Sequence, residues 1–198
     1  MTRRVLISVS DKTGIENFAR SLVELNFEII STGGTASSLK NAKIPVIDIS
    51  EFTGLPEILG GRVKTLHPKV YAGLLARRSD AKHVEQLKKL NIPYIDLVVF
   101  NLYPFKKTIA KEGVTIEEAI ENIDIGGPTA IRAAAKNYES VGVVINPEQY
   151  EEVLKELKSH NGELTLKTRF KLAAEVFHYT SQYDDMIFKY LKMKEQIN

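Results

Sequence analysis

The chain has 198 residues, 43% of them hydrophobic and 26% charged, which is the composition of an ordinary globular protein. Its formal net charge of +2 is too close to neutrality to favour nucleic-acid binding. There is no cysteine, which excludes disulfides, thiolate nucleophiles and cysteine-type zinc sites and agrees with a cytoplasmic location. The four histidines lack metal-ligand spacing and no apolar run reaches transmembrane length, so we expect neither a metal site nor a membrane span.

The first part of the chain alternates between strand and helix patterns. Strands are predicted at 5–9, 27–30 and 46–49, with helices at 13–25 and 36–41 between them. This alternation predicts a parallel sheet with right-handed crossovers, in which ligands bind at the carboxyl ends of the strands. Residues 51–71 interrupt the pattern with glycines and prolines, and we expect an irregular loop of functional importance there.

The second part returns to the sheet and then becomes helical. The patterns predict a helix at 79–90, a buried strand at 95–100, helices at 115–122 and 129–136, a last strand at 141–145, and helices at 148–159 and 164–194. Thr115 and Glu118 are spaced as a capping box. We therefore expect an α/β domain over residues 1–146. A helical extension over residues 147–198 would pack on it or lead to a further domain.

A glycine-rich turn, Ser31-Thr32-Gly33-Gly34-Thr35, joins the second strand to a helix. Successive N–H groups and the helix dipole at such a turn favour a phosphate or a carboxylate, although a tight turn that needs positive φ is the alternative. Neither a Walker loop nor a Rossmann fingerprint is present, which favours a monophosphate. Ser10-Asp11-Lys12 ends the first strand, where Lys12 would add charge and Asp11 could instead cap the next helix.

Two further loops carry cationic and polar candidates. Arg62 and Lys64 would point the same way in an extended backbone, and the glycines that precede them favour an ordered functional loop over a basic surface loop. Asn101 and Tyr103 follow the buried strand, and their alternative role is to satisfy an ordinary strand end.

Asp124 and Lys136 are candidates for an acid/base pair. Asp124 precedes Gly126-Gly127-Pro128 and a helix start, which is an anion-binding arrangement, and Lys136 lies near the far end of that helix. The sequence shows no serine–histidine nucleophile pattern and no metal-ligand cluster. The candidates together suit non-covalent acid/base chemistry on a phosphorylated small molecule.

These segments together resemble a known family. The motifs that support the resemblance are residues 8–14, 31–35, 60–68, 101–105, 124–127 and 132–137. They resemble the inosine monophosphate (IMP) cyclohydrolase domain of the bifunctional purine-biosynthesis enzymes, and only the Ser-Asp-Lys and Gly-Gly-Thr portions are shared with the wider methylglyoxal-synthase-like fold. The resemblance implies a three-layer α/β fold with a central, mainly parallel sheet and C-terminal helices.

The resemblance also implies an activity. It would be IMP cyclohydrolase, a hydrolase of the cyclic-amidine class that needs no cofactor or metal. The enzyme closes the ring of 5-formamidoimidazole-4-carboxamide ribonucleotide with loss of water, in the last step of de novo purine biosynthesis. Asp124 would assist deprotonation of the carboxamide nitrogen, and Lys136 would be the principal proton donor and acceptor. Lys64 and Tyr103 would polarise and orient the formyl and carboxamide groups.

Substrate-binding residues follow from the same resemblance. The phosphoribosyl end would contact Ser10, Asp11, Lys12, Thr32, Gly33, Gly34, Thr35, Arg62 and Thr65. Asn101 and the backbone N–H groups of Asp124 and Ile125 would hold the base, and Ser31 and Gly126 complete the set. A homodimer is implied as well, together with a formyltransferase domain or protein of the same pathway, a domain that these residues do not contain.

Two alternatives share the fold. One is a regulatory domain that senses a phosphorylated nucleotide, as at the end of carbamoyl phosphate synthetases, but a sensor has no need of Lys64, Tyr103, Asp124 and Lys136. The other is methylglyoxal synthase, whose further acidic and histidine pattern we do not find.

Overall fold

A five-stranded parallel sheet forms the centre of the structure, a computed structural model that describes residues 2–195. The strands are β1 (Arg3–Val9), β2 (Phe27–Ser31), β3 (Ile47–Asp48), β4 (Leu97–Asn101) and β5 (Gly142–Val144), in the order β3-β2-β1-β4-β5. All four neighbouring pairs are parallel. The predicted α/β class with a parallel sheet is confirmed.

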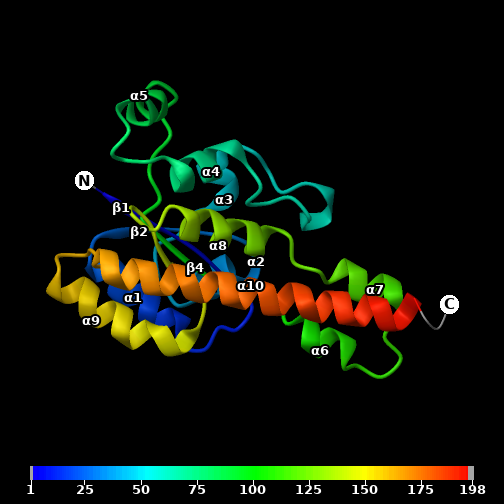
Figure 1. Ribbon diagram of the computed structural model, residues 1–198. Helices are drawn as coiled ribbons and strands as arrows, with labels where there is room; N and C mark the ends of the chain where they lie inside the picture. The colour runs from blue at the N-terminus through cyan, green and yellow to red at the C-terminus, as the bar shows by residue number, and fades with distance from the viewer. Residues whose placement is uncertain (1, 196–198) are drawn as a thin grey trace.

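Helices cover both faces of the sheet, which explains its continuous apolar strands. Helix α1 (Ile15–Glu24) packs against β2, α2 (Gly33–Asn41) and α9 (Tyr150–Ser159), and Phe18 stacks on Tyr150 at 4.2 Å between ring centroids. Helix α8 (Gly126–Lys136) covers β4 and β5, with α4 (Pro68–Leu75) beside it. Figure 1 shows α8 and α4 above the sheet and α1 and α9 below it. These are the three layers that the sequence predicts.

The long helix α10 (Leu166–Glu195) runs across the molecule and packs against α8, β5 and α6 (Phe105–Ile109) (Figure 1). Within the predicted extension, α9 packs against α1 and α10 packs against α8 and β5. Between residues 2 and 195, no helix is both long enough and apolar enough to cross a membrane.

The remaining helices are α3 (Ile49–Thr53), α5 (Ala81–Lys89), α7 (Ile116–Glu121) and two 3-10 turns, Leu59–Gly61 and Pro147–Gln149. Thr115 caps α7 as predicted, since its hydroxyl accepts the Glu118 N–H at 3.0 Å. Segment 51–71 is less irregular than expected, because it holds the end of α3 and the start of α4. Helix α6 was not predicted at all.

Two helices begin earlier than predicted, and both do so at glycines. Helix α2 begins at Gly33 rather than residue 36, and α8 begins at Gly126 rather than residue 129. In α8 the carboxylate of Asp124 accepts the Gly127 N–H at 2.8 Å and so satisfies one of the donors that a helix start leaves without a partner. Glycine is a weak helix former, and the cap overrides that preference here.

Strands β1 and β4 lie side by side at the centre of the sheet, with Val9 opposite Asn101. From β1 the chain moves outward to β2 and β3, and from β4 it moves in the other direction to β5. The boundary between β1 and β4 is therefore the point at which the direction of winding reverses, and ligands of open α/β sheets bind outside the carboxyl ends of the strands at such a point.

One buried hydroxyl connects α2 to β1 and yields a prediction about stability. Thr35 Oγ1 donates to the Val9 carbonyl and accepts the Val9 N–H, both at 3.0 Å. Thr35→Val keeps the volume but leaves both backbone groups buried without a partner, so we expect a loss of about 1–3 kcal/mol in the free energy of unfolding. Urea unfolding measures this loss. Ser37→Ala, on the exposed side of α2, should change stability by less than about 0.5 kcal/mol, and equal losses would contradict the assignment.

Candidate active site

The glycine-rich turn forms a cationic site at the start of α2. The first intrahelical bond joins the Ala36 N–H to the Thr32 carbonyl, so the preceding N–H groups remain available. A Cβ placed on Gly33 would lie 3.6 Å from Lys64 Nζ, and one on Gly34 would lie 3.9 Å from Lys12 Nζ. Two ammonium groups thus flank the helix start, an arrangement that suits a phosphate.

The three hydroxyls predicted in this turn have different surroundings. Ser31 Oγ donates to the Ile7 carbonyl at 2.7 Å, and the Thr35 hydroxyl is bonded to Val9 on both sides. Both side chains therefore hold the sheet together and leave only backbone groups for a ligand. Thr32 Oγ1, in contrast, is buried and has no partner among the described residues. A buried hydroxyl without a partner calls for an acceptor or donor from outside the chain.

The loop that carries Arg62 and Lys64 pairs each cation with a carboxylate. Lys64 Nζ lies 3.1 Å from Glu57 Oε1, and Arg62 donates to both oxygens of Glu121 on α7. The hydrogen bond between Arg62 and Glu121 raises the pKa of the guanidinium and lowers the pKa of the carboxyl group. Gly61, beside the Glu57–Lys64 pair, has φ +93°, a backbone conformation that favours glycine.

Asn101 joins the ends of β1 and β4. Its Oδ1 accepts the N–H groups of Ser10 at 2.7 Å and Asp11 at 2.8 Å, and its Nδ2 donates to the Asp11 carbonyl at 3.0 Å. The Asp11 carboxylate accepts the N–H and the hydroxyl of Thr13 at 2.9 and 2.7 Å, which lowers its pKa. Asp11 thus forms a local turn with Thr13 and does not cap α1, whose N-cap is Gly14 with no side-chain hydrogen bond. Lys12 is the residue of this loop that reaches the start of α2.

Asp124 lies at the start of α8, next to the loop that follows β4. Its Oδ1 accepts the Gly127 N–H at 2.8 Å and its Oδ2 accepts the Tyr103 N–H at 3.3 Å. The Thr65 hydroxyl lies 3.1 Å from a Cβ placed on Gly126, which brings the 60–68 loop to the same helix start. Each carboxylate oxygen keeps a lone pair for a ligand. Tyr103 is 47% exposed and Ile125 is 60% exposed.

Three tyrosines near Asp124 were not predicted as site residues. Tyr183 Oη accepts the Asp124 N–H at 2.9 Å, and Tyr179 Oη accepts the Leu102 N–H at 3.2 Å. Burial, and secondarily the charge of Asp124, raises the pKa of the Tyr71 phenol to about 12. The only signal in the sequence is the i, i+4 spacing of Tyr179 and Tyr183, which places them on one face of a helix.

Lys136 is the one predicted catalytic residue that the structure does not bring to this edge. It is the last residue of α8, ten residues after Gly126, which at about 1.5 Å per residue places it roughly 15 Å along the helix. Its side chain is exposed. The next residue, Asn137, is buried and donates to the carbonyls of Leu74 and Ala76 at 2.7 and 3.0 Å, which fixes this end of α8 to α4.

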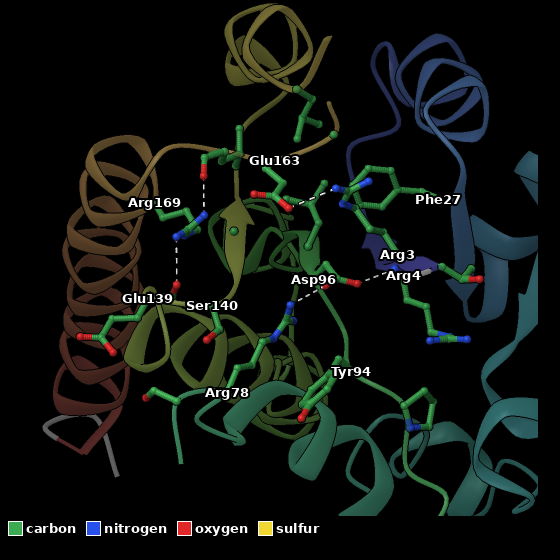
Figure 2. A pocket seen from close by; sticks show the side chains of 18 residues that line it. Arg3, Arg4, Phe27, Arg78, Tyr94, Asp96, Glu139, Ser140, Glu163 and Arg169 are labelled. Atoms are coloured by element: carbon green, nitrogen blue, oxygen red, sulfur yellow. Dashed lines mark hydrogen bonds and ion pairs between the residues drawn. The ribbon is translucent and has the colours of Figure 1, made fainter. Parts of the chain in front are cut away.

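A cavity of about 820 Å³ lies at the opposite, amino edge of the sheet (Figure 2). Its guanidinium groups have partners within the chain: Arg78 bonds Asp96 at 2.8 Å, and Arg169 donates to the carbonyls of Tyr138 and Glu139 at 2.8 and 2.9 Å. No predicted site residue lines it. We therefore place the candidate site at the carboxyl edge. Within residues 2–195, no three acidic or histidine side chains gather as metal ligands would.

The fold and this edge define a class of protein: a doubly wound α/β domain whose candidate site lies where its winding reverses. Comparison with family models makes the assignment specific. The model of the MGS-like domain matches residues 14–129, and the model of the AICARFT/IMPCHase bienzyme matches residues 134–198. The chain belongs to the MGS-like domain family.

Similar proteins agree with this assignment. The chain is 61% identical over 197 residues to the bifunctional purine biosynthesis protein PurH of Acetivibrio thermocellus and 58% identical over 189 residues to that of Listeria monocytogenes. These matches cover 100% and 96% of the chain but only 38% and 37% of the relatives. The solved structure of ForH superposes with a TM-score of 0.83 at 34% identity, covering 94% of this chain and 97% of that one. The resemblance to the bifunctional purine-biosynthesis enzymes is confirmed.

Gly33 provides a test of the phosphate site. It has φ +52°, which strains an alanine, so Gly33→Ala would relieve the strain only by moving the backbone at the start of α2. We expect about tenfold weaker binding of inorganic phosphate, measured by calorimetry. Gly54→Ala is the matched control, because Gly54 has φ +78° with no atom within 4 Å of its Cβ position. Equal affinities of the two variants for phosphate would argue against a phosphate site at the start of α2.

Proposed function

We propose that this chain is an IMP cyclohydrolase, which closes the ring of 5-formamidoimidazole-4-carboxamide ribonucleotide to give IMP and water. The observation that supports it most is the position of Asp124: a carboxylate with free lone pairs at the same sheet edge as a cationic phosphate site. The names of the relatives, bifunctional purine biosynthesis proteins, agree with a substrate of this class. The formyl-transfer reaction is not part of the proposal.

The reaction needs a better nucleophile than an amide. The carboxamide nitrogen attacks the formyl carbon, a carbon–nitrogen bond forms, and the formyl oxygen takes up a proton. The hydroxyl group then leaves that carbon as water while the formamido nitrogen gives up its proton to form the carbon–nitrogen double bond, which completes the aromatic ring; the attacking nitrogen keeps one hydrogen. Asp124 accepts the carboxamide proton, because its two oxygens each use only one lone pair on a backbone N–H. Tyr103, exposed beside it, orients the reacting groups.

The phosphoribosyl end occupies the cationic site at the start of α2. The N–H groups of Gly33 and Gly34 and the ammonium groups of Lys12 and Lys64 contact the phosphate. Lys64 takes this role in place of the predicted one at the formyl group, because its Nζ lies 3.6 Å from the Cβ position of Gly33. Lys64 exchanges its exposed partner Glu57 for the ligand, at a small cost because ion pairs of exposed groups are weak. No cofactor takes part, and we place the activity in the cytoplasm, beside the formyltransferase domain or protein that supplies the formylated substrate.

A homodimer belongs to the proposal because of Lys136. The roughly 15 Å of helix between Gly126 and Lys136 is more than a lysine side chain can span, so a role in catalysis requires Lys136 from a second copy. The outer face of α10 carries exposed apolar side chains at helical spacing, namely Leu166, Phe170, Phe177 and Phe188. Phe177 lies under Arg132 of α8, so this surface continues onto the helix that ends in Lys136. We propose that a second copy covers it.

Mixing two inactive variants tests the shared site. If Lys136 acts across a dimer, Lys136→Ala and Asp124→Asn each remove a different part of the same site. After the variants are mixed and allowed to exchange subunits, mixed dimers contain one intact site and recover activity that neither variant has alone. Absence of recovery, with subunit exchange demonstrated by mass, would rule out the shared site. Full activity of Lys136→Ala alone would remove Lys136 from the mechanism.

The activity itself is tested by absorbance on the purified 198-residue chain with the formamido ribonucleotide and no added metal or folate. We expect conversion to IMP and, for Asp124→Asn, a kcat lower by about 10²–10⁴. Asp185→Asn is the control, since Asp185 forms only an exposed ion pair with Lys189 on α10. Tight binding of IMP with no conversion of the formamido ribonucleotide would instead favour a regulatory domain that senses nucleotides. Formation of methylglyoxal from dihydroxyacetone phosphate would indicate methylglyoxal synthase.

A further inference from the structure

Two tyrosines of α10 contact the backbone on either side of the proposed reaction centre. Tyr183 Oη accepts the N–H of Asp124, and Tyr179 Oη accepts the N–H of Leu102, the residue before Tyr103. Their spacing of four residues puts both phenols on the same face of the helix. We propose that Tyr179 and Tyr183 are positioning residues. They hold the Asp124 carboxylate, and the Tyr103 N–H that it accepts, in the position required to contact the ligand. This inference rests on the proposed function.

The contacts form a closed path around the carboxylate. Asp124 Oδ2 accepts the Tyr103 N–H at 3.3 Å, so the carboxylate and its donor lie on two segments that are 21 residues apart in the chain. Tyr183 holds the backbone of the first segment, and Tyr179 holds the backbone of the second. Because both phenols belong to one rigid helix, the distance between the two segments is set by α10.

The backbone groups involved lie outside regular structure and need partners. Leu102 follows the last residue of β4, and Asp124 lies between α7 and α8, so neither N–H is used by a sheet or helix ladder. Burial raises the pKa of both phenols, and the Asp124 charge acts in the same direction, so both stay neutral at physiological pH. A neutral phenol that accepts one N–H still has its own proton to donate.

This arrangement connects the two parts of the chain that separate family models match. Asp124 and Leu102 lie within residues 14–129, whereas both tyrosines lie within residues 134–198. A domain with the first part alone would keep the glycine-rich turn and Lys64 of the proposed phosphate site but would lose the two hydrogen bonds that fix the carboxylate. The helix thereby adds to an anion-binding fold the positional precision that acid/base chemistry requires.

The test compares Tyr179→Phe, Tyr183→Phe and Tyr190→Phe in the full chain. Tyr190 is the matched control: it lies on the same helix and packs edge-on against Phe105, as Tyr183 does, with centroid distances of 5.7 and 6.3 Å. The Tyr190 hydroxyl is buried but has no partner among the described residues. All three changes keep the ring and its packing. Only the first two remove an acceptor from a backbone N–H.

Two readouts separate positioning from stability. Hydrogen exchange at the amides of Leu102 and Asp124, followed by NMR, should accelerate at least tenfold in the variant that lacks the corresponding phenol. The kcat of Tyr183→Phe should fall about ten- to hundredfold with KM within about twofold, since a displaced carboxylate affects the reaction more than phosphate binding. Tyr190→Phe should change neither quantity.

Unchanged amide exchange in Tyr179→Phe and Tyr183→Phe would overturn the proposal, and so would accelerated exchange with unchanged kcat. An equal loss of kcat in Tyr190→Phe would overturn it as well, by showing a general effect of changing this helix. A wild-type chain that does not convert the substrate overturns the proposed function separately. The exchange measurement, which needs no substrate, then decides whether the phenols hold Asp124 in place.

Discussion

The carboxyl edge of the sheet depends on one amide side chain. Asn101 ends β4, and its carbonyl oxygen and amide group bind the backbone of Ser10 and Asp11 at the end of β1. These two strands are neighbours at the point where the chain reverses its winding. By holding the ends of β1 and β4 together, Asn101 fixes the loop that carries Lys12 over the start of α2. The proposed phosphate site and Asp124 therefore lie at the same edge of the sheet.

The site is divided electrostatically. At one end are the α2 helix start and the ammonium groups of Lys12 and Lys64, which suit a dianionic phosphate. At the other end Asp124 receives two backbone N–H groups that stabilise its charge without neutralising it. The cations of the 60–68 loop are balanced by exposed carboxylates, so this loop adds little net charge when no phosphate is bound. Binding affinity and proton transfer are thus assigned to separate groups.

The sequence predicts what depends on local pattern. The apolar run of β4 and the cap at Thr115 could each be predicted because neighbouring residues determine them. Contacts between distant segments could not be predicted. The bond between Tyr183 and Asp124 joins residues 59 apart, and the hydroxyls of Ser31 and Thr35 bind backbone because of strand register, which their motif does not encode. The position of Lys136, roughly 15 Å from Gly126, follows from the helical rise of α8. The motif residues alone do not include this distance.

The stiffness of α10 links two surfaces of the molecule. The helix has 30 residues, about 45 Å, and presents tyrosines to Asp124 on its inner side and exposed phenylalanines on its outer side. Under the proposed dimer, a second copy would rest on the outer side of the same helix whose inner side positions Asp124. A displacement of α10 by that contact would couple association to ligand binding at the sheet edge, and thermodynamic reciprocity requires that each would alter the other by the same factor.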